Sequence, residues 1–226
     1  MAVVPRHRFV RVPFHVHVRV ACVYVHASGI PFDDRQPKAE ENKEKTPHKI
    51  PTELVMWLDD FINLLPKQGH LLELGSAHGR EARYLRDKGF IMTCTDIIPQ
   101  AIEELRSDNF ETYLYDFRDA PKKEWADLFD GFIANAVYLH ATKDIFEKSL
   151  TDITSILKIN SILCITFKLG EGEEIETEKL EGERYFKYYT KEELVDIIKQ
   201  HKNLELLSLS ESDDTKWIQL LLKKRF

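Results

Sequence analysis

Residues 71–85 read LLELGSAHGREARYL, an apolar run that ends at an acid and then turns through small residues into a segment of helical pattern. A short apolar run bounded by glycine predicts a buried strand. Gly75 and Gly79 flank a turn in which the backbone can approach a ligand closely. A strand, a glycine turn and a helix in this order are typical of the repeating unit of an α/β sheet.

Helical and strand patterns alternate along the rest of the chain. Strands separated by helices of this length predict right-handed crossovers and a mostly parallel sheet with helices on both faces. Only the short turn SDD, residues 212–214, joins the last two strands, so these two must be antiparallel. In such sheets, ligands bind outside the carboxyl ends of the strands. We expect helices over residues 52–65, 79–89, 99–108, 144–157 and 190–201, and strands over residues 70–74, 90–96, 111–116, 131–136, 161–167, 204–211 and 215–224.

The composition limits the class of protein. With 226 residues and 43% hydrophobic content, the chain can bury one substantial core. Its cysteines, Cys22, Cys94 and Cys164, lie far apart and show no metal-binding spacing, so we expect a reduced, cytoplasmic protein without a metal site. No apolar run reaches the roughly 18 residues of a membrane span, so we expect no membrane association.

The first fifty residues differ from the rest. Residues 1–31 carry four arginines and no acid, which leaves a charge of −10 on the remainder of a chain whose total is −6. Residues 31–50 are polar and contain three prolines, which is typical of a linker. We predict an N-terminal appendage and linker over residues 1–50, with disorder or a cleaved targeting segment as alternatives, and one domain over residues 51–226. The acidic body would repel a polyanion, which disfavours nucleic acid as a partner.

Three carboxylates fall at or near the ends of successive predicted strands: Glu73, Asp96 and Asp116. Each one alone could cap the helix that follows it. Together they would line one edge of the sheet, where buried charges need a ligand or hydrogen-bond donors. Asp96 follows Gly79 by 17 residues, a spacing that suits an acid bound to the hydroxyls of a ribose. Asp116 could then accept an exocyclic amino group, with Phe117 as an apolar wall for a purine.

The segment ELGSAHG resembles the first motif of the class I S-adenosylmethionine-dependent methyltransferases, an acid followed by Gly-x-Gly-x-Gly. It contains Glu73, Gly75, Ala77 and Gly79, so Ala77 departs from the family's glycine. The extra methyl group would be tolerated if the loop needs no positive φ at that position. The resemblance covers about residues 52–226. It implies a seven-stranded, mostly parallel Rossmann-like sheet in the order 3-2-1-4-5-7-6, with strand 7 antiparallel and helices on both faces.

The same resemblance implies a site for S-adenosylmethionine. Asp96 would bind the ribose, Asp116 with Phe117 would bind the adenine, and the loop from Glu73 to Gly79 would pass under the methionine part. Residues 129–141, FDGFIANAVYLHA, are similar to the small-molecule branch of the family, in which the residues after strand four face the cofactor. The implied cofactor-binding residues are Glu73, Gly75, Ser76, Gly79, Asp96, Ile97, Asp116, Phe117, Asn135 and Ala136.

An acceptor side is implied by FKLGEGE, residues 167–173, and RYFKYYTKEEL, residues 184–194, which also look like that branch. A small-molecule acceptor would take the methyl group by in-line displacement, without a metal. His140 is the candidate base, with an ordinary histidine at a helix start as the alternative. Residues 171–183 predict a solvated, mobile loop or a lid. The acceptor pocket would be shaped by Tyr138, Lys168, Arg184, Tyr185 and Tyr188, of which Lys168 and Arg184 favour a negatively charged acceptor.

Other readings of the sequence give different functions. A nicotinamide-dependent oxidoreductase would need glycines in place of Ala77 and Arg80, so we reject it. A tRNA wobble-uridine methyltransferase and a non-catalytic methyltransferase-like binding protein remain as alternatives. We expect a structural role for His78, core positions for Trp57 and Trp217, and a monomer or homodimer.

Overall fold

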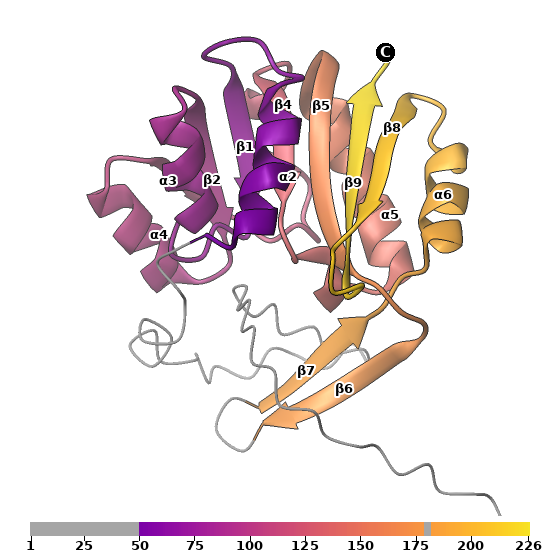
Figure 1. Cartoon of the computed structure of the whole chain (residues 1–226). Helices are drawn as coiled ribbons and strands as arrows, with labels where there is room; N and C mark the ends of the chain where they lie inside the picture. The colour runs from indigo at the N-terminus through magenta and orange to yellow at the C-terminus, as the bar shows by residue number, and fades with distance from the viewer. Residues whose placement is uncertain (1–49, 179–181) are drawn as a thin grey trace, which may run out of the picture.

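The computed structural model describes residues 50–178 and 182–226 (Figure 1). The predicted N-terminal appendage, residues 1–50, lies outside this part of the chain except for Ile50. No helix in the described ranges is long and apolar enough to cross a membrane.

A seven-stranded sheet forms the centre of the molecule, in the order β3-β2-β1-β4-β5-β9-β8 (Figure 1). The first five of these strands are parallel, whereas β9 is antiparallel to both of its neighbours. The predicted strand order and the reversed last strand are therefore confirmed. The strands are β1 (His70–Leu74), β2 (Ile91–Asp96), β3 (Glu111–Leu114), β4 (Phe129–Ala134), β5 (Leu157–Lys168), β8 (Leu204–Glu211) and β9 (Trp217–Lys224).

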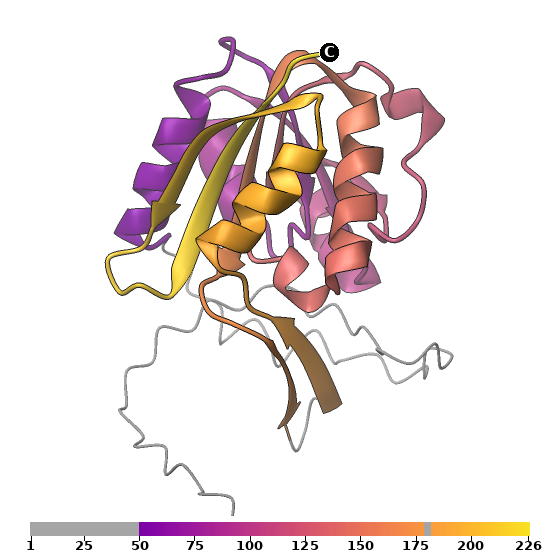
Figure 2. The same ribbon diagram turned by 90° about the vertical axis from the view of Figure 1, so that its right-hand side faces the viewer.

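Helices cover both faces of this sheet, because side chains alternate between the faces along each strand. Leu71, Cys94 and Ile133 pack into the core layer with α2, α3 and α4. Their neighbours Leu72 and Ala134 pack into the layer with α5 and α6, which lie together in Figure 2. The helices are α2 (Thr52–Ile62), α3 (Arg80–Asp87), α4 (Pro99–Ser107), α5 (Lys143–Ile156) and α6 (Lys191–Gln200), with short 3₁₀ turns η1 (Lys123–Trp125) and η2 (Tyr138–His140).

A β-hairpin replaces the loop predicted over residues 171–183. Strands β6 (Glu173–Glu178) and β7 (Gly182–Lys187) pair with each other in a separate two-stranded sheet, which extends from the carboxyl end of the parallel strands (Figures 1 and 2). The prediction of a loop was wrong because charged residues hide the strand pattern. In the register, Glu173 lies opposite Lys187 and Glu176 lies opposite Arg184, and pairs of opposite charge stabilise neighbouring strands.

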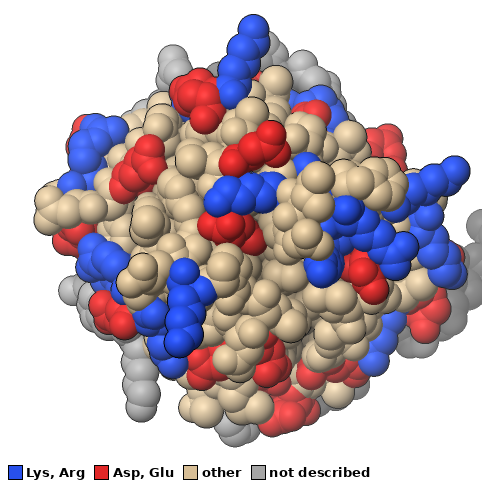
Figure 3. All heavy atoms as spheres, turned by 90° about the horizontal axis from the view of Figure 1, so that it is seen from above, with Lys and Arg blue, Asp and Glu red and all other residues tan. Residues whose placement is uncertain are grey.

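The opposite end of the sheet has mixed charge. Viewed from above, on the side away from the hairpin, basic and acidic side chains are interspersed with uncharged residues (Figure 3). At this end, for example, Lys158 forms an ion pair with Asp130 at 2.8 Å. The face drawn in Figure 3 therefore has no extended patch of one sign. The site of interest lies at the other end, below the sheet in Figure 1.

Candidate cofactor and acceptor site

The turn between β1 and α3 is built on two glycines. Gly75 has φ of 68° and Gly79 has φ of 71°, in the left-handed region that favours glycine. A Cβ atom at Gly75 would lie 2.7 Å from the side chain of Val137, and one at Gly79 would lie 2.4 Å from that of Leu105. Both glycines are therefore required by backbone conformation and by packing. They bring the turn against the chain that leaves β4.

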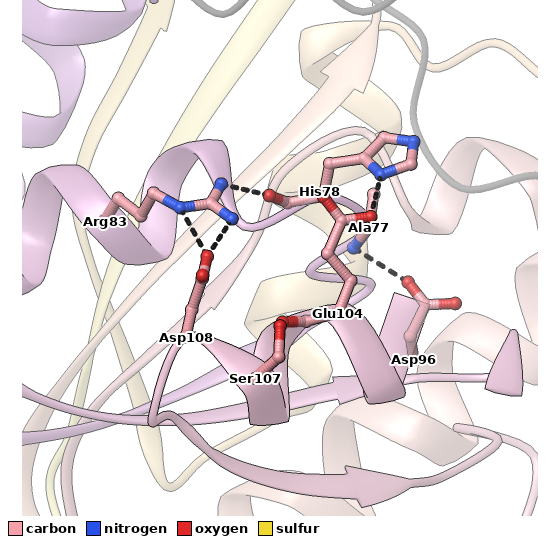
Figure 4. Close-up of polar contacts among 7 residues, drawn as sticks. All are labelled: Ala77, His78, Arg83, Asp96, Glu104, Ser107 and Asp108. Atoms are coloured by element: carbon pink, nitrogen blue, oxygen red, sulfur yellow. Dashed lines mark hydrogen bonds and ion pairs between the residues drawn. The ribbon is translucent and has the colours of Figure 1, made fainter. Parts of the chain in front are cut away.

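Ala77 also has a positive φ, 46°. The condition under which the extra methyl group would be tolerated, a loop without a positive φ at this position, is therefore not met. A left-handed conformation costs an L-residue other than glycine roughly 1–2 kcal/mol. The turn is held in this conformation in part by a hydrogen bond of 2.8 Å from the Ala77 N–H to Oδ2 of Asp96 (Figure 4).

Asp96 ends β2 and is almost completely buried. Its second oxygen, Oδ1, accepts a hydrogen bond of 2.9 Å from the N–H of Ile98, the residue before α4. Burial raises the pKa of Asp96 to about 6, against the lowering effect of the N–H groups of Ile98 and Ala77. The N–H of Ile97 also lowers the pKa of Asp96 by hydrogen bonding. Asp96 thus orders both the glycine turn and the start of α4.

His78 takes part in a structural network at the tip of the turn (Figure 4). Its Nδ1 lies 3.1 Å from Oε2 of Glu104 on α4. Arg83 donates to the carbonyl of His78 and also forms an ion pair with Asp108. These contacts tie the turn to α3 and α4, as expected for a structural histidine.

Glu73 is buried below the turn without full hydrogen bonding. Its side chain shares a face with Leu71, on the side of α3, and only 2% of the residue is exposed. Among the described residues, Oε2 of Glu73 has no hydrogen-bond partner. Burial, reinforced by the nearby Glu81 carboxylate, raises the pKa of Glu73 to about 8. Ser76 is buried in the same turn.

Arg80 and Glu81 form a buried ion pair at the first turn of α3. Nε of Arg80 donates to Oε1 of Glu81 at 3.1 Å, and Nη2 of Arg80 donates to the same oxygen. Nη1 of Arg80 is buried and has no hydrogen-bond partner in the part of the chain that the structure describes. Asn135, just after β4, donates from Nδ2 to Oε1 of Glu81 at 2.7 Å. Arg80 and Glu81 were not predicted as site residues, although both directly follow Gly79 in the motif.

The predicted adenine-binding pair differs from expectation. Asp116 accepts three hydrogen bonds from the Arg118 guanidinium, two of them from Nε, and one of 2.9 Å from the Arg118 N–H. Phe117 is only 1% exposed, and its ring packs edge to face on Tyr138 at 5.4 Å. The Phe117 side chain therefore belongs to the core, and its prediction as a ligand wall is wrong. The backbone at this position remains beside Asp116.

The turn η2 holds His140 against the hairpin. Nδ1 of His140 donates to the carbonyl of Tyr185 on β7 at 2.9 Å, and its ring lies 4.8 Å from that of Phe186. A carbonyl can only accept, so the Nδ1–H tautomer is fixed and Nε2 carries the lone pair. Burial lowers the pKa of His140 to about 4. Tyr138, in contrast, is fully buried with its hydroxyl 2.8 Å from that of Ser149, so its predicted place in the acceptor pocket is wrong.

Aromatic residues surround Lys168 at the end of β5. Nζ of Lys168 lies 4.3 Å from the centre of the Phe186 ring and 5.4 Å from that of Tyr188. Tyr188 and Trp217 are half-buried and pack on the small cluster that contains Phe186. Trp217 thus borders this cluster instead of the main core, and Arg184 is buried in β7. We call Lys168, Phe186, Tyr188 and Trp217 the aromatic rim.

Metal ligands do not gather in this region. Within residues 50–178 and 182–226, no group of three His, Cys, Asp or Glu side chains is placed to hold a metal ion. Cys94 and Cys164 are buried free thiols, and burial raises the pKa of Cys164 to about 12. The polar groups at the strand ends are therefore the candidates for ligand binding.

Comparison with known proteins finds similarity in structure but not in sequence. No family model matches the chain, and no curated protein matches it. A S-adenosylmethionine-dependent methyltransferase from Methanosarcina mazei is 15% identical, covering 73% of this chain and 96% of its own, with a TM-score of 0.63. A 1,6-didemethyltoxoflavin-N1-methyltransferase from Burkholderia thailandensis, solved with 1,6-didemethyltoxoflavin and S-adenosylhomocysteine, is 13% identical over 91% of this chain and 100% of its own, with a TM-score of 0.65.

A chain from Rhodobacter sphaeroides that is named as a zinc-dependent alcohol dehydrogenase also matches, at 13% identity over 83% of this chain and 97% of its own, with a TM-score of 0.67. Identities this low establish architecture, whereas chemistry has to be argued from the site. The two methyltransferase structures match over 73% and 91% of this chain, which includes most of the seven-stranded sheet. The chain therefore has the fold of the S-adenosylmethionine-dependent methyltransferases.

Proposed function

We propose that this protein is a S-adenosylmethionine-dependent methyltransferase that acts on a small-molecule acceptor. The proposal rests on the fold together with one observation at the end of β1. Two buried polar atoms, Oε2 of Glu73 and Nη1 of Arg80, lack hydrogen-bond partners in the described ranges. Unsatisfied buried polar groups are costly, so these two atoms support a ligand-binding role. A ligand cation would favour the ionised form of Glu73, whose pKa burial raises to about 8.

An amino-acid zwitterion matches these two atoms. A carboxylate oxygen such as Oε2 of Glu73 can accept from an ammonium group, and a guanidinium nitrogen such as Nη1 of Arg80 can donate to a carboxylate. S-adenosylmethionine carries both groups on its methionine part. The glycines at the two ends of the turn let it pack closely on Val137 and Leu105, and this packing would hold the turn in place for the methionine part.

The nucleoside part would lie toward β2 and β3. The Asp96 carboxylate is held by backbone N–H groups and can accept further hydrogen bonds from the ribose hydroxyls. Both oxygens of Asp116 accept from Arg118, so Asp116 would take the adenine amino group in exchange for one of these contacts. Because the Phe117 ring is buried, only its backbone can contribute at this position.

The acceptor would lie between η2 and the aromatic rim. When bound, the cofactor supplies a methyl group on a sulfonium, which is transferred by in-line displacement. Lys168, which has no carboxylate partner within residues 50–178 and 182–226, would attract an acceptor with negative charge. Half-buried Tyr188 and Trp217 would contact a flat, apolar part of it. His140 would accept a hydrogen bond from the acceptor at Nε2, since its Nδ1 is already used.

Calorimetry with S-adenosylmethionine and S-adenosylhomocysteine tests the cofactor assignment, with NAD as the control ligand. We expect binding of both nucleosides and no binding of NAD. The opposite pattern would support a dehydrogenase, and binding of none would support a non-catalytic protein. Incubating the enzyme and labelled cofactor with panels of small anionic aromatic acids, neutral aromatics and tRNA then tests the acceptor class. Methylation of tRNA would contradict the small-molecule proposal.

A further inference from the structure

Polar side chains from three elements meet on one face of the sheet, where the chain leaves β4. Thr166 on β5 shares a face with Cys164, and Asn135 after β4 shares a face with Ile133, both in the layer of α3. Glu81 is on the first turn of α3 itself. The alternation of side chains therefore directs these three residues into one space.

Their hydrogen bonds run in a single direction. The Ala136 N–H donates to Oγ1 of Thr166 at 2.8 Å, and the Thr166 hydroxyl donates to Oδ1 of Asn135 at 2.7 Å. Asn135 then donates from Nδ2 to Glu81 at 2.7 Å, and Glu81 is paired with Arg80. We call this chain of bonds, from Ala136 to Arg80, the β4–α3 relay. The single hydroxyl oxygen of Thr166 both accepts from one neighbour and donates to the other, which an aliphatic side chain cannot do.

The relay holds an unusual backbone conformation. Ala136 has φ of 54°, in the left-handed region, although it carries a Cβ atom and is completely buried. Such a conformation persists only where the surrounding structure determines it. The next residues form η2, closed by the bonds His140 N–H to Val137 carbonyl at 3.1 Å and Ala141 N–H to Tyr138 carbonyl at 3.1 Å. The direction in which η2 leaves the sheet, and with it the place of His140, depends on Ala136.

We propose that Thr166 is a positioning residue that links the cofactor end of the site to the acceptor end through the β4–α3 relay. The inference rests on the proposed function. In this arrangement, a ligand carboxylate at Arg80 would fix the Arg80–Glu81 pair, which fixes Asn135 and then η2. A bound cofactor would thereby hold His140 in place for the acceptor. Thr166 itself touches neither ligand in this account.

Hydrogen–deuterium exchange of the full-length chain, with and without S-adenosylhomocysteine, tests the proposal. Thr166→Val keeps the shape of the side chain and removes both relay bonds, whereas Thr166→Ser keeps the hydroxyl. The matched control is Thr154→Val, because Thr154 is equally buried but bonds only within α5, to the carbonyl of Leu150. Without ligand, we expect exchange of the Ala136 amide and of residues 137–141 to become at least tenfold faster in Thr166→Val. We expect no such change in Thr166→Ser or Thr154→Val.

The exchange measurements with S-adenosylhomocysteine distinguish failure of this inference from failure of the proposed function. In the wild type, S-adenosylhomocysteine should slow exchange of residues 137–141 severalfold. In Thr166→Val it should still bind, as seen by calorimetry, but no longer slow this segment. Equal exchange in unliganded wild type and Thr166→Val would overturn the positioning role, whether or not the nucleoside binds. Ligand protection that survives in Thr166→Val would overturn the link between the two ends. Failure of the wild type to bind the nucleoside would instead reject the proposed function, with the unliganded comparison still deciding the role of Thr166.

Discussion

Replacing Glu73 with glutamine should stabilise the unliganded protein and weaken cofactor binding. Burial raises the pKa of Glu73 to about 8 from an ordinary value of 4.5. Between these pH values the folded protein binds the proton and the unfolded chain has lost it, so the stability of the wild type falls as the pH rises through this window. Relative to low pH, where both states bind the proton, Glu73 lowers the free energy of unfolding by roughly 3 kcal/mol at pH 7 and by less than about 1 kcal/mol at pH 5.

Glutamine has nearly the same shape and no charge to bury. We therefore expect Glu73→Gln to raise the free energy of unfolding in urea by up to about 3 kcal/mol at pH 7, and by about 1 kcal/mol or less at pH 5. The loss of a charged acceptor for the ammonium group should lower S-adenosylhomocysteine affinity by roughly 1.5–3 kcal/mol in calorimetry.

Glu81→Gln is the matched control, because Glu81 is a buried carboxylate of the same turn that is already paired with Arg80. It should destabilise the protein, since it leaves the guanidinium without its anion. The reasoning about Glu73 is refuted if Glu73→Gln is no more stable than the wild type at pH 7, or if its gain is the same at both pH values.

Three further predictions concern neighbouring groups. Ala77→Gly should raise the free energy of unfolding by roughly 0.5–1 kcal/mol, because glycine relieves the strain of a φ of 46° but adds freedom to the unfolded chain; no gain in urea unfolding would contradict this. Asp96→Ala should cost roughly 1.5–3 kcal/mol of S-adenosylhomocysteine affinity in calorimetry, and an unchanged dissociation constant would exclude the ribose assignment. The pKa of His140, lowered by burial to about 4, should leave its ring neutral above pH 5 in an NMR titration, and a midpoint near 6.5 would contradict the structure. Because the unfolded chain takes up this proton first, the contribution of His140 to stability should fall as the pH drops from 6.5 toward 4.

The sequence predicts the sheet well because its central parallel strands β1, β2 and β4 are mostly buried and contrast with the helices between them. β1 and β8 have the predicted bounds, and the other strands differ by one or two residues at an end, although β5 begins four residues early. The helix predicted over residues 190–201 is present as α6, which begins with a capping box formed by Thr190 and Glu193. The hairpin was not predicted because β6 has no continuous apolar face. Ile175 lies between two acids and is exposed.

Side-chain direction was harder to predict outside regular strands. The chain turns sharply after Ala136, so the alternation that holds through β4 says nothing about Tyr138, which is buried in the core. Phe117 was misplaced for a similar reason, since it lies three residues beyond the end of β3. Glu73 and Asp96, in contrast, lie within strands, and the sequence predicted their position at one edge of the sheet.

Two backbone hydrogen bonds join the chain segments that connect the hairpin to the sheet. The Tyr189 N–H donates to the carbonyl of Lys168 at 3.0 Å, and the Gly170 N–H donates to the carbonyl of Tyr189 at 3.1 Å. Because these bonds hold the two ends of the hairpin together, the hairpin can change in length with only a small change in the entropy of loop closure. Its strands pair only with each other, so no hydrogen bond of the seven-stranded sheet depends on them. Tyr185 and Phe186 would have to keep their contacts with η2, but the rest of the segment between Gly170 and Tyr189 can vary, and a new acceptor preference could arise there while the nucleoside-binding half stays as it is.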